Sequence, residues 1–261
     1  MKALAIAATG MTAQQRNVEV IANNIANLNT TGFKRARAEF SDLMYQSLRR
    51  QGATSSENGT VVPAGVEIGL GVKPVAVTRV ISQGALQMTG NPLDLALEGR
   101  GYIQVTLPDG SAAYTRAGNL QKSPEGMIVT ADGFEVSPGI AIPENAREVS
   151  ITREGEVLAY LDAEPEPQNI GRIQLAAFVN DAGLEALGDS LFRATAASGG
   201  PLEGFPGDPG FATVRQGYVE SSNVDSVAEI TSLITAQRAY EMNSKVIETA
   251  DQMGQRVSQM R

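Results

Sequence analysis

The chain of 261 residues contains no cysteine, no histidine and no tryptophan. Without cysteine it has no disulfide and no thiolate nucleophile, and without histidine it lacks the commonest catalytic base, pH switch and zinc ligand. These absences exclude most hydrolase and redox chemistries. We therefore expect no catalytic residue, no cofactor and no metal site. An enzyme of the carboxylate or metal-carboxylate type is the alternative left open.

Basic side chains are also scarce, since 21 lysines and arginines face 29 acidic residues and give a net charge of −8. An acidic surface repels phosphate backbones, so we expect no nucleic-acid partner. The carboxylates are dispersed and no glycine-rich phosphate loop precedes a helix, so we expect no small-molecule substrate. The apolar run at residues 3–8 is shorter than the roughly 7 to 15 residues of a secretory core, which predicts that no signal peptide is cleaved.

A seven-residue apolar repeat marks the N-terminal end. Leu4, Met11, Val18 and Ile25 are seven apart, and other apolar residues occupy the intervening positions. This spacing predicts a helix reaching about residue 28, with a seam of the coiled-coil kind. Few charges interrupt it, so the helix needs partners. We expect it to end near Gly32, because glycine adopts the left-handed conformation that closes helices.

The C-terminal end has a matching pattern. Ser221, Ser222 and Asn223 can cap a helix that has Asp225 in its first turn. An apolar stripe begins at 227 and changes phase near 237–239. It resumes with the 4-3-4-3 spacing of a coiled coil at Val246, Ala250, Met253, Val257 and Met260. The sequence therefore predicts one long helix at each end.

Between the helices, turn signals separate short apolar runs. Residues 102–107 and 113–116 flank Pro-Asp-Gly, and 127–130 and 134–136 flank Asp-Gly, which predicts two hairpins. Further strands are expected at 149–152, 156–161 and 172–179, whereas 51–71 and 198–210 are rich in glycine or proline and are expected to be irregular. The predicted fold class is α+β, with a coiled-coil-like inner domain and a central antiparallel sheet or small barrel.

Four asparagines interrupt the end of the first repeat, at residues 23, 24, 27 and 29. Asparagine is a poor helix former, but at a helix interface its hydrogen bonds can fix the register. We interpret these residues as contacts to neighbouring helices. The basic cluster Lys34, Arg35 and Arg37, with Arg49 and Arg50 further along, is interpreted as a solvated face, and a specific contact to an anion or a partner is the alternative.

At this motif the sequence resembles the axial proteins of the bacterial flagellum, which form rod, hook and hook-associated segments. The residues that carry the resemblance are 21–34, with Thr30-Thr31-Gly32-Phe33-Lys34 at their end, together with 216–224 and Gln237-Arg238-Ala239-Tyr240-Glu241. It covers essentially the whole chain. The chain is most similar to the basal-body rod protein family, and residues 45–71 resemble the stretch that marks subunits of the distal rod.

The resemblance implies a structural subunit that polymerises helically into the drive shaft between motor and hook. It also implies export without a cleaved signal peptide and a place in the rod that crosses the periplasm. The implied partners are further copies of the chain, the proximal rod proteins, the hook protein, the surrounding P and L ring proteins and the flagellar type III export apparatus. Alternatives are a proximal-rod or hook subunit of the same family, or a secreted β-rich binding module.

Four segments are expected: an N-terminal helical assembly segment (1–44), an extended arm containing glycine and proline (45–85), a β domain (86–215) and a C-terminal helical assembly segment (216–261). The residues that we expect at the assembly interface lie on the two helices, in the family motifs or at glycine and proline positions of the arm. They are Leu4, Met11, Val18, Ile21, Asn23, Asn24, Ile25, Asn27, Leu28, Gly32, Phe33, Pro63, Gly65, Gly69, Gly71, Asn223, Val227, Ile230, Ile234, Gln237, Arg238, Tyr240, Val246, Met253 and Val257.

Overall fold

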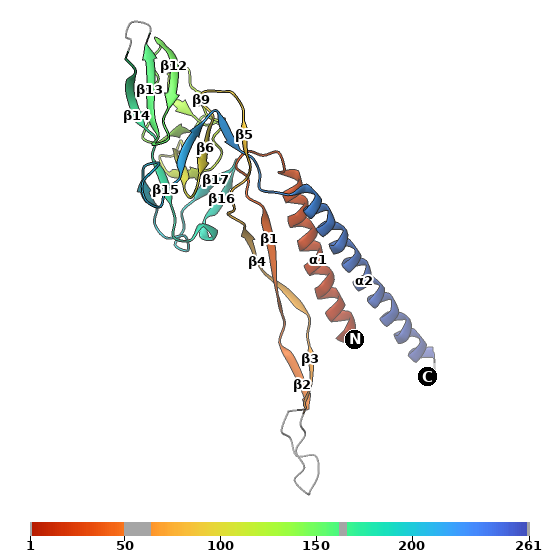
Figure 1. Ribbon diagram of the computed structural model, residues 1–261. Coiled ribbons are helices and arrows are strands. Elements are labelled where there is room, and N and C mark those ends of the chain that lie inside the picture. Colours follow the sequence, from red (N-terminus) through yellow and green to blue (C-terminus); the bar gives the residue numbers. More distant parts are fainter. Residues whose placement is uncertain (1, 50–63, 162–165, 260–261) are drawn as a thin grey trace. The chain divides into compact units, whose positions relative to one another are not determined.

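The computed structural model describes residues 2–49, 64–161 and 166–259, and it divides into two compact units (Figure 1). The first unit comprises Met1–Ile25, Ala36–Thr78 and Asp225–Arg261, and the second comprises Ala26–Arg35 and Arg79–Val224. Each unit is therefore built from segments that lie far apart in the sequence.

The first unit contains both long helices, α1 (Lys2–Ala26) and α2 (Ser226–Gln259), which run side by side in Figure 1. The predicted terminal helices are confirmed. No helix in the described part of the chain is long and apolar enough to span a membrane.

The predicted end of the first helix is wrong by a few residues. Helix α1 stops at Ala26, and the chain then turns, with the Thr30 hydroxyl donating to Asn27 Oδ1 at 3.1 Å. Asparagine side chains that bond locally in this way compete with helix continuation. Gly32 does have a left-handed φ of 69°, but it lies beyond this turn rather than at the helix end.

The predicted cap of the second helix is also corrected. Asp225 Oδ1 accepts hydrogen bonds from the backbone N–H groups of Val227 and Ala228, at 2.9 and 3.2 Å. Asp225 is therefore the N-cap itself and not a first-turn residue. Asn223 cannot cap the helix because its side chain is engaged within the second unit, where it donates to Val80 O at 2.8 Å.

Four strands complete the first unit. Strand β1 (Ala36–Asp42) pairs with β4 (Val72–Arg79), and β2 (Tyr45–Arg49) pairs antiparallel with β3 (Val66–Gly69). The prediction of irregular structure for residues 51–71 is thus wrong at β3, where Val66 and Ile68 supply β-branched side chains suited to a strand. The remainder of the predicted arm, residues 50–63 with Pro63, lies outside the described residues.

The second unit is built around an antiparallel sheet of nine strands in the described chain, in which β7 is central. One edge of β7 pairs with β8, and the other pairs with β15 near its start and β11 near its end. The strands are β7 (Tyr102–Thr106), β8 (Ala112–Thr115), β9 (Gln121–Lys122), β10 (Ile128–Val129), β11 (Glu135–Val136), β15 (Leu175–Ala177), β16 (Glu185–Gly188), β17 (Leu191–Arg193) and β18 (Leu202–Gly204).

Smaller sheets pack around this one. Three strands pair in sequence order, β12 (Ala146–Ile151), β13 (Glu156–Leu161) and β14 (Gln168–Arg172). Two pairs join distant segments, β6 (Leu95–Glu98) with β19 (Thr213–Gln216), and β5 (Leu86–Met88) with β20 (Tyr218–Glu220). The described chain also contains one 3₁₀ turn, η1 (Asp181–Gly183).

The α+β class and both predicted hairpins are confirmed, but the small-barrel alternative is wrong. The large sheet runs from β16 to β9 and these two end strands do not pair in the described chain, so the sheet stays open. Its core is aliphatic, with Ile103, Val105 and Val136 at 0 to 1% exposure. A second cluster is aromatic, with Tyr102, Tyr114, Phe178 and Phe192 meeting edge to face. Residues 198–210 are predicted to be irregular, but strand β18 forms within them at Leu202–Gly204, so this prediction is wrong at those three residues.

Candidate assembly interface

Helix α1 buries a narrow face of mainly small residues. Ala7, Ala13, Ile21 and Asn24 are buried, whereas the predicted seam residues Leu4, Met11, Val18 and Ile25 are only half-buried. Much of the predicted seam therefore remains accessible in the single chain.

Asn24 connects three elements of the first unit. Its amide donates to Ala36 O at 2.8 Å and to Glu229 Oε2 at 3.3 Å, and its Oδ1 accepts from Ala36 N at 2.8 Å. Asn24 is 1% exposed, so these bonds are shielded from water. The asparagine that sequence analysis assigned to neighbouring helices thus fixes α1 against α2 and β1 within one chain. Asn23 is exposed, and Asn27 and Leu28 are half-buried.

A glycine sets how closely the two helices approach. A Cβ at Gly10 would lie 3.0 Å from Asn243 Nδ2 on α2. Glycine costs about 1 kcal/mol in a helix relative to alanine, and its use here is explained by this contact. Glycine at this position therefore leaves room for the Asn243 side chain between the helices.

One face of helix α2 packs against the rest of its own chain, and another face is exposed. Glu229 and Ala236 are buried on the inner face. The predicted stripe residues Val227, Ile230 and Ile234 are exposed, Val227 by 72%. The stripe predicted from the sequence is thus apolar surface that the single chain does not cover.

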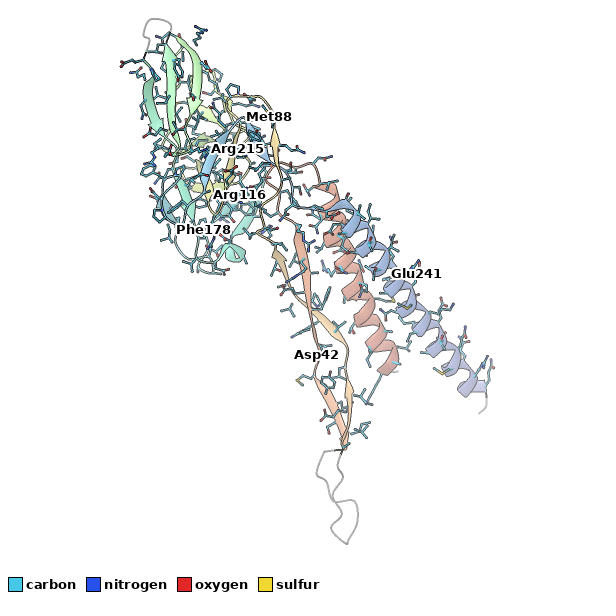
Figure 2. The ribbon with its side chains drawn as sticks, viewed as in Figure 1. Asp42, Met88, Arg116, Phe178, Arg215 and Glu241 are labelled. Carbon is cyan, nitrogen blue, oxygen red and sulfur yellow. The ribbon has the colours of Figure 1, made fainter. Side chains whose placement is uncertain are left out.

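Two open grooves lie along the pair of helices α1 and α2. One, of about 500 Å³, is lined by Gln15, Val18, Gln237, Tyr240 and Glu241. The other, of about 450 Å³, is lined mainly by apolar side chains, those of Ala3, Met242, Val246, Ala250 and Met253 together with Lys245 and Thr249. Glu241, which lines the first groove, is labelled on α2 in Figure 2. Arg238 is exposed, and the side chain of Val257 lies outside the described residues.

Hydroxyl groups on α2 are bonded to their own helix. Thr231, Ser232, Thr235 and Thr249 each donate to the backbone carbonyl four residues earlier, at 2.8 to 2.9 Å. Such bonds are a common way for hydroxyl side chains to be accommodated inside a helix.

The paired strands β2 and β3 also expose apolar side chains. Met44, Tyr45, Leu48 and Leu70 are all exposed. The pairing continues past the strands, since Leu70 N donates to Met44 O at 3.2 Å. Among the predicted arm residues, Gly65, Gly69 and Gly71 are half-buried.

Gly71 joins this pair of strands to α1. Its φ of 121° lies in a region that favours glycine, and a Cβ would overlap Thr9 Oγ1. The same hydroxyl accepts a hydrogen bond from Val72 N at 3.3 Å. Thr9 itself donates to Ile6 O at 2.7 Å, so its hydroxyl has both a donor and an acceptor role.

The other end of the family motif lies in the second unit, where Lys34 is buried. Its ammonium group is 2.5 Å from Glu220 Oε1 and donates to Ser82 O at 2.8 Å. Glu220 also pairs with Arg116 at 3.4 Å and accepts from Gly84 N at 2.8 Å. Burial lowers the pKa of Lys34 more strongly than the Glu220 contact raises it. The interpretation of Lys34 as part of a solvated face is therefore wrong.

Neighbouring motif residues pack around this ion network. Gly32 N donates to Glu220 O at 2.8 Å, and a Cβ at Gly32 would lie 2.7 Å from Ala117 N. Asn223 Oδ1 accepts from Arg35 N at 2.7 Å, while Phe33 is half-buried. Sequence reasoning missed Arg116 and Glu220 because no local pattern marks a charge that is buried by a distant segment. The sole hint was that Glu220 lies inside the C-terminal motif.

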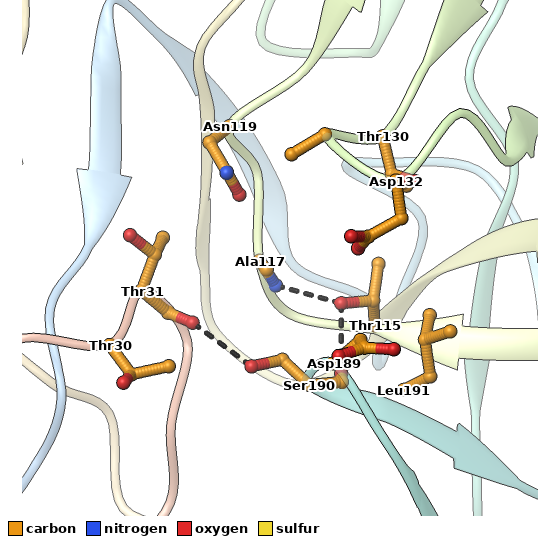
Figure 3. Close-up of a pocket in the computed structure, with 11 residues that line it drawn as sticks. Thr30, Thr31, Thr115, Ala117, Asn119, Thr130, Asp132, Asp189, Ser190 and Leu191 are labelled. Carbon is orange, nitrogen blue, oxygen red and sulfur yellow. Dashed lines mark hydrogen bonds between the residues drawn. The ribbon is translucent and has the colours of Figure 1, made fainter. Parts of the chain in front are cut away.

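A cavity of about 210 Å³ lies beside the turn at Thr30 and Thr31. Ser190 donates to Thr31 O at 3.4 Å, and Thr115 donates to Ser190 O at 3.0 Å (Figure 3). Asp189 and Ser190 both have positive φ, as expected for the two-residue turn that joins β16 to β17. These contacts hold the turn after α1 against the sheet.

Nothing in the described residues groups three histidine, cysteine or acidic side chains at metal-binding spacing. Among the acidic residues after β13, Glu164 lies outside the described residues and Glu166 is exposed.

Three family models match the chain. Residues 4–34 match the model described as "Flagella basal body rod protein", residues 96–159 match "Flagellar hook protein FlgE/F/G D1 domain", and residues 215–260 match "Flagellar basal body rod FlgEFG protein C-terminal". The matched ranges include both helices and part of the large sheet.

Curated relatives match over nearly their full length. "Flagellar basal-body rod protein FlgG" of Caulobacter vibrioides is 58% identical over 100% of both chains. The protein of the same name from Agrobacterium fabrum is 55% identical over 99% of this chain and 98% of its own. That from Bacillus subtilis is 39% identical over 94% and 93%.

Proposed function

The chain belongs to the family of flagellar basal-body rod proteins, and we propose that it forms the distal rod by helical self-assembly, transmitting torque from the motor to the hook. It is a structural protein of the flagellar basal body. The observation that carries the proposed assembly is the open apolar stripe on α2.

The size of the stripe makes it a candidate for burial between copies. Val227, Ile230, Ile234 and Met253 are each at least 45% exposed. Burying a fully exposed side chain of this type contributes roughly 1.5 to 3 kcal/mol, and covering these partly exposed side chains contributes a fraction of that. Contiguous exposed apolar side chains of this kind are typical of association surfaces rather than of a monomer's exterior.

The partner that we propose for the stripe is a second copy of the chain. The predicted seam residues Leu4, Met11, Val18 and Ile25 on α1 are half-buried and offer apolar surface of the same kind. Helices from several copies that pack in this way would share torsional load over many contacts. Asn24 supports this role because it holds α1 and α2 together as one building block.

The paired strands β2 and β3 are proposed as a bridge between adjacent subunits. They expose Met44, Tyr45 and Leu48 on a narrow two-stranded element. A two-stranded hairpin has little stability of its own in water. Burial of these side chains against another copy would stabilise the element and stiffen the shaft.

We also propose which components the chain contacts, where it lies and how it is exported. Within the basal body we propose contacts with the proximal rod proteins, the hook protein and the surrounding P and L rings, and a position where the rod crosses the periplasm. We further propose delivery by the flagellar type III export apparatus without a cleaved signal peptide. The low density of basic residues and the absence of cysteine and histidine are compatible with these assignments.

Seeded polymerisation tests the interface. Ile234→Asp places a charge in the stripe, and Thr235→Asp places the same charge on the next residue, about 100° round the helix. Both positions are exposed, so neither charge disturbs the isolated chain. We expect Ile234→Asp to abolish growth of rods on purified seeds in electron micrographs.

The control variant Thr235→Asp should grow as the wild type does, and both variants should keep the wild-type melting temperature as dilute monomers. A chain lacking residues 1–30 should fail to grow as well. Wild-type growth of Ile234→Asp would exclude the stripe from the interface.

A further inference from the structure

The groove of about 500 Å³ along α1 and α2 belongs wholly to the first unit. Its lining consists of Gln15, Val18, Gln237, Tyr240 and Glu241. Among these described residues Glu241, labelled on α2 in Figure 2, carries the single charge. A groove with one negative charge in its lining suits a guest with one positive charge.

The polar side chains of the groove offer hydrogen-bond acceptors. Gln15 Nε2 donates to Glu19 Oε1 at 3.3 Å, which leaves the amide oxygen of Gln15 to accept a bond. The charge of Glu19 is balanced by Arg16 at 3.3 Å. Glu241 forms no ion pair or hydrogen bond with a described residue, so both of its carboxylate oxygens are open. Lys245, four residues further along α2, lines the other groove instead.

Tyr240 adds an aromatic ring to these acceptors, and it is 40% exposed. A guanidinium group stacks on aromatic rings and carries five N–H donors in one plane, so acceptors beside a ring favour arginine over lysine. The chain makes such a contact elsewhere. The Arg215 guanidinium lies 4.1 Å from the ring centre of Tyr218 and pairs with Glu98 at 2.9 Å. The groove therefore has the chemistry of an arginine site.

Arg238 is an exposed arginine of α2 that makes no ion pair with a described residue. It lies three residues before Glu241, a spacing that permits an ion pair within a helix, yet none forms. Successive helix residues are about 100° apart, so Arg238 lies about 160° round the helix from Tyr240. It follows Ile234 by four residues and so continues the exposed apolar stripe. Arg238 therefore faces whatever covers the stripe and not the groove of its own chain.

We propose that the groove holds the Arg238 side chain of a second copy, with the guanidinium between Glu241 and Gln15 and against the ring of Tyr240. The contact rests on the proposed self-assembly and specifies one of its interfaces. The stripe that leads to Arg238 then covers the apolar surface of Val18. Two different surfaces meet, the stripe of one copy and the groove of the next, so the contact repeats along a polymer instead of closing a dimer.

Two charge reversals test this contact between chains. Arg238→Glu brings two carboxylates together and Glu241→Arg brings two guanidinium groups together, so neither variant alone should elongate purified seeds. An equimolar mixture should elongate them, because every contact joins opposite charges when the two variants alternate. Pairing within one chain cannot be rescued in this way. Elongation by either variant alone at the wild-type rate, or no elongation by the mixture, would overturn the proposal.

Arg256→Glu is the matched control. Arg256 is also exposed on α2, but it lies about 22 Å further along the helix from Glu241, at 1.5 Å per residue. This variant should elongate seeds as the wild type does, and all the variants should keep the wild-type melting temperature as dilute monomers. An equal loss of elongation in Arg256→Glu would show that the charge of α2 matters and not the groove.

Sedimentation of the soluble full chain separates this contact from rod growth. The wild type should self-associate as its concentration rises, each reversal should weaken the association, and the mixture should restore it. If the wild type associates in this way but adds to no seed, the proposed rod assembly fails and the contact stands. If the mixture sediments as monomers, the contact is overturned even where wild-type rods grow.

Arg238→Lys distinguishes a guanidinium site from a simple charge contact. Lysine keeps the charge but loses the planar fork, so association should weaken by about tenfold or more, the effect of losing one hydrogen bond to a charged group. Tyr240→Leu keeps the apolar surface and should reduce the preference for arginine over lysine. Association of Arg238→Lys at the wild-type strength would contradict the proposed site.

Discussion

Lys34 Nζ lies 2.5 Å from Glu220 Oε1, although 186 positions separate the two residues in the chain. Both side chains are almost completely buried, at 1% and 0% exposure. The contact joins the segment that follows α1 to the segment that precedes α2. The second unit is therefore complete only when both segments have docked on it.

Glu220→Gln should strongly destabilise the second unit. The substitution leaves Lys34 and Arg116 buried without a counter-charge, and breaking a buried pair in this way costs about 3 to 5 kcal/mol. Glu98→Gln is the control because its partner Arg215 is exposed, and an exposed pair contributes at most about 1 kcal/mol. Urea unfolding measures both losses. Equal losses would show that the Lys34 pair contributes no more than a surface pair.

Gly32→Ala should cost more than backbone conformation alone explains. A positive φ costs about 1 to 2 kcal/mol for a residue with a Cβ, and at Gly32 the new atom also meets Ala117 N. Gly110 has a φ of 80°, but a Cβ added there would meet nothing within 4 Å, so Gly110→Ala isolates the backbone cost. Thermal unfolding of both variants gives the difference. A larger loss in Gly110→Ala would contradict the close approach at Gly32.

Gly71→Ala should detach the paired strands from α1. The methyl group would displace Thr9 and break the bond from Val72 N, and the φ of 121° adds strain. We expect faster hydrogen exchange at the Val72 amide. Gly69→Ala is the control in the same element, since its Cβ would lie at an ordinary 3.4 Å from the Tyr45 ring. Unchanged exchange in Gly71→Ala would argue against the Thr9 contact.

Alkaline pH should destabilise the second unit through Tyr102. Burial raises the pKa of Tyr102 above its ordinary 10.0, so above pH 10 the unfolded chain releases a proton that the folded chain retains. Stability is fully present below pH 10 and declines above it, by about 1.4 kcal/mol per pH unit from this group. Tyr102→Phe should show a shallower decline in urea unfolding between pH 10 and 11. Identical slopes would place the hydroxyl in water.

The helices and hairpins could be predicted because their signals are local. The repeat at Leu4, Met11 and Val18 specifies α1, and Asp132-Gly133 specifies the turn between β10 and β11. The burial of Lys34 could not be predicted in the same way, because the charge that permits it lies on β20. Helix ends were also missed, since Asn27 and Asp225 act through side-chain bonds that several nearby residues could have made.

The proposed interface could be predicted only in part from the sequence. Periodicity identifies apolar stripes but not which of two adjacent faces the chain covers itself. On α2 the chain covers Glu229 and Ala236 and leaves Ile230 and Ile234 in water. That choice depends on Asn24 and Gly10 of α1, which fix how the helices meet, and no spacing on α2 alone reveals it.

The hydroxyl groups along α2 form hydrogen bonds within the helix, so they need no water as a hydrogen-bond acceptor. Thr231, Ser232 and Thr249 donate to carbonyls of their own helix while they are still exposed. When another surface displaces the surrounding water, these donors keep their acceptors, so dehydration leaves none of them unsatisfied. A neighbouring copy in the proposed assembly therefore needs no specific polar partner for each of these hydroxyls.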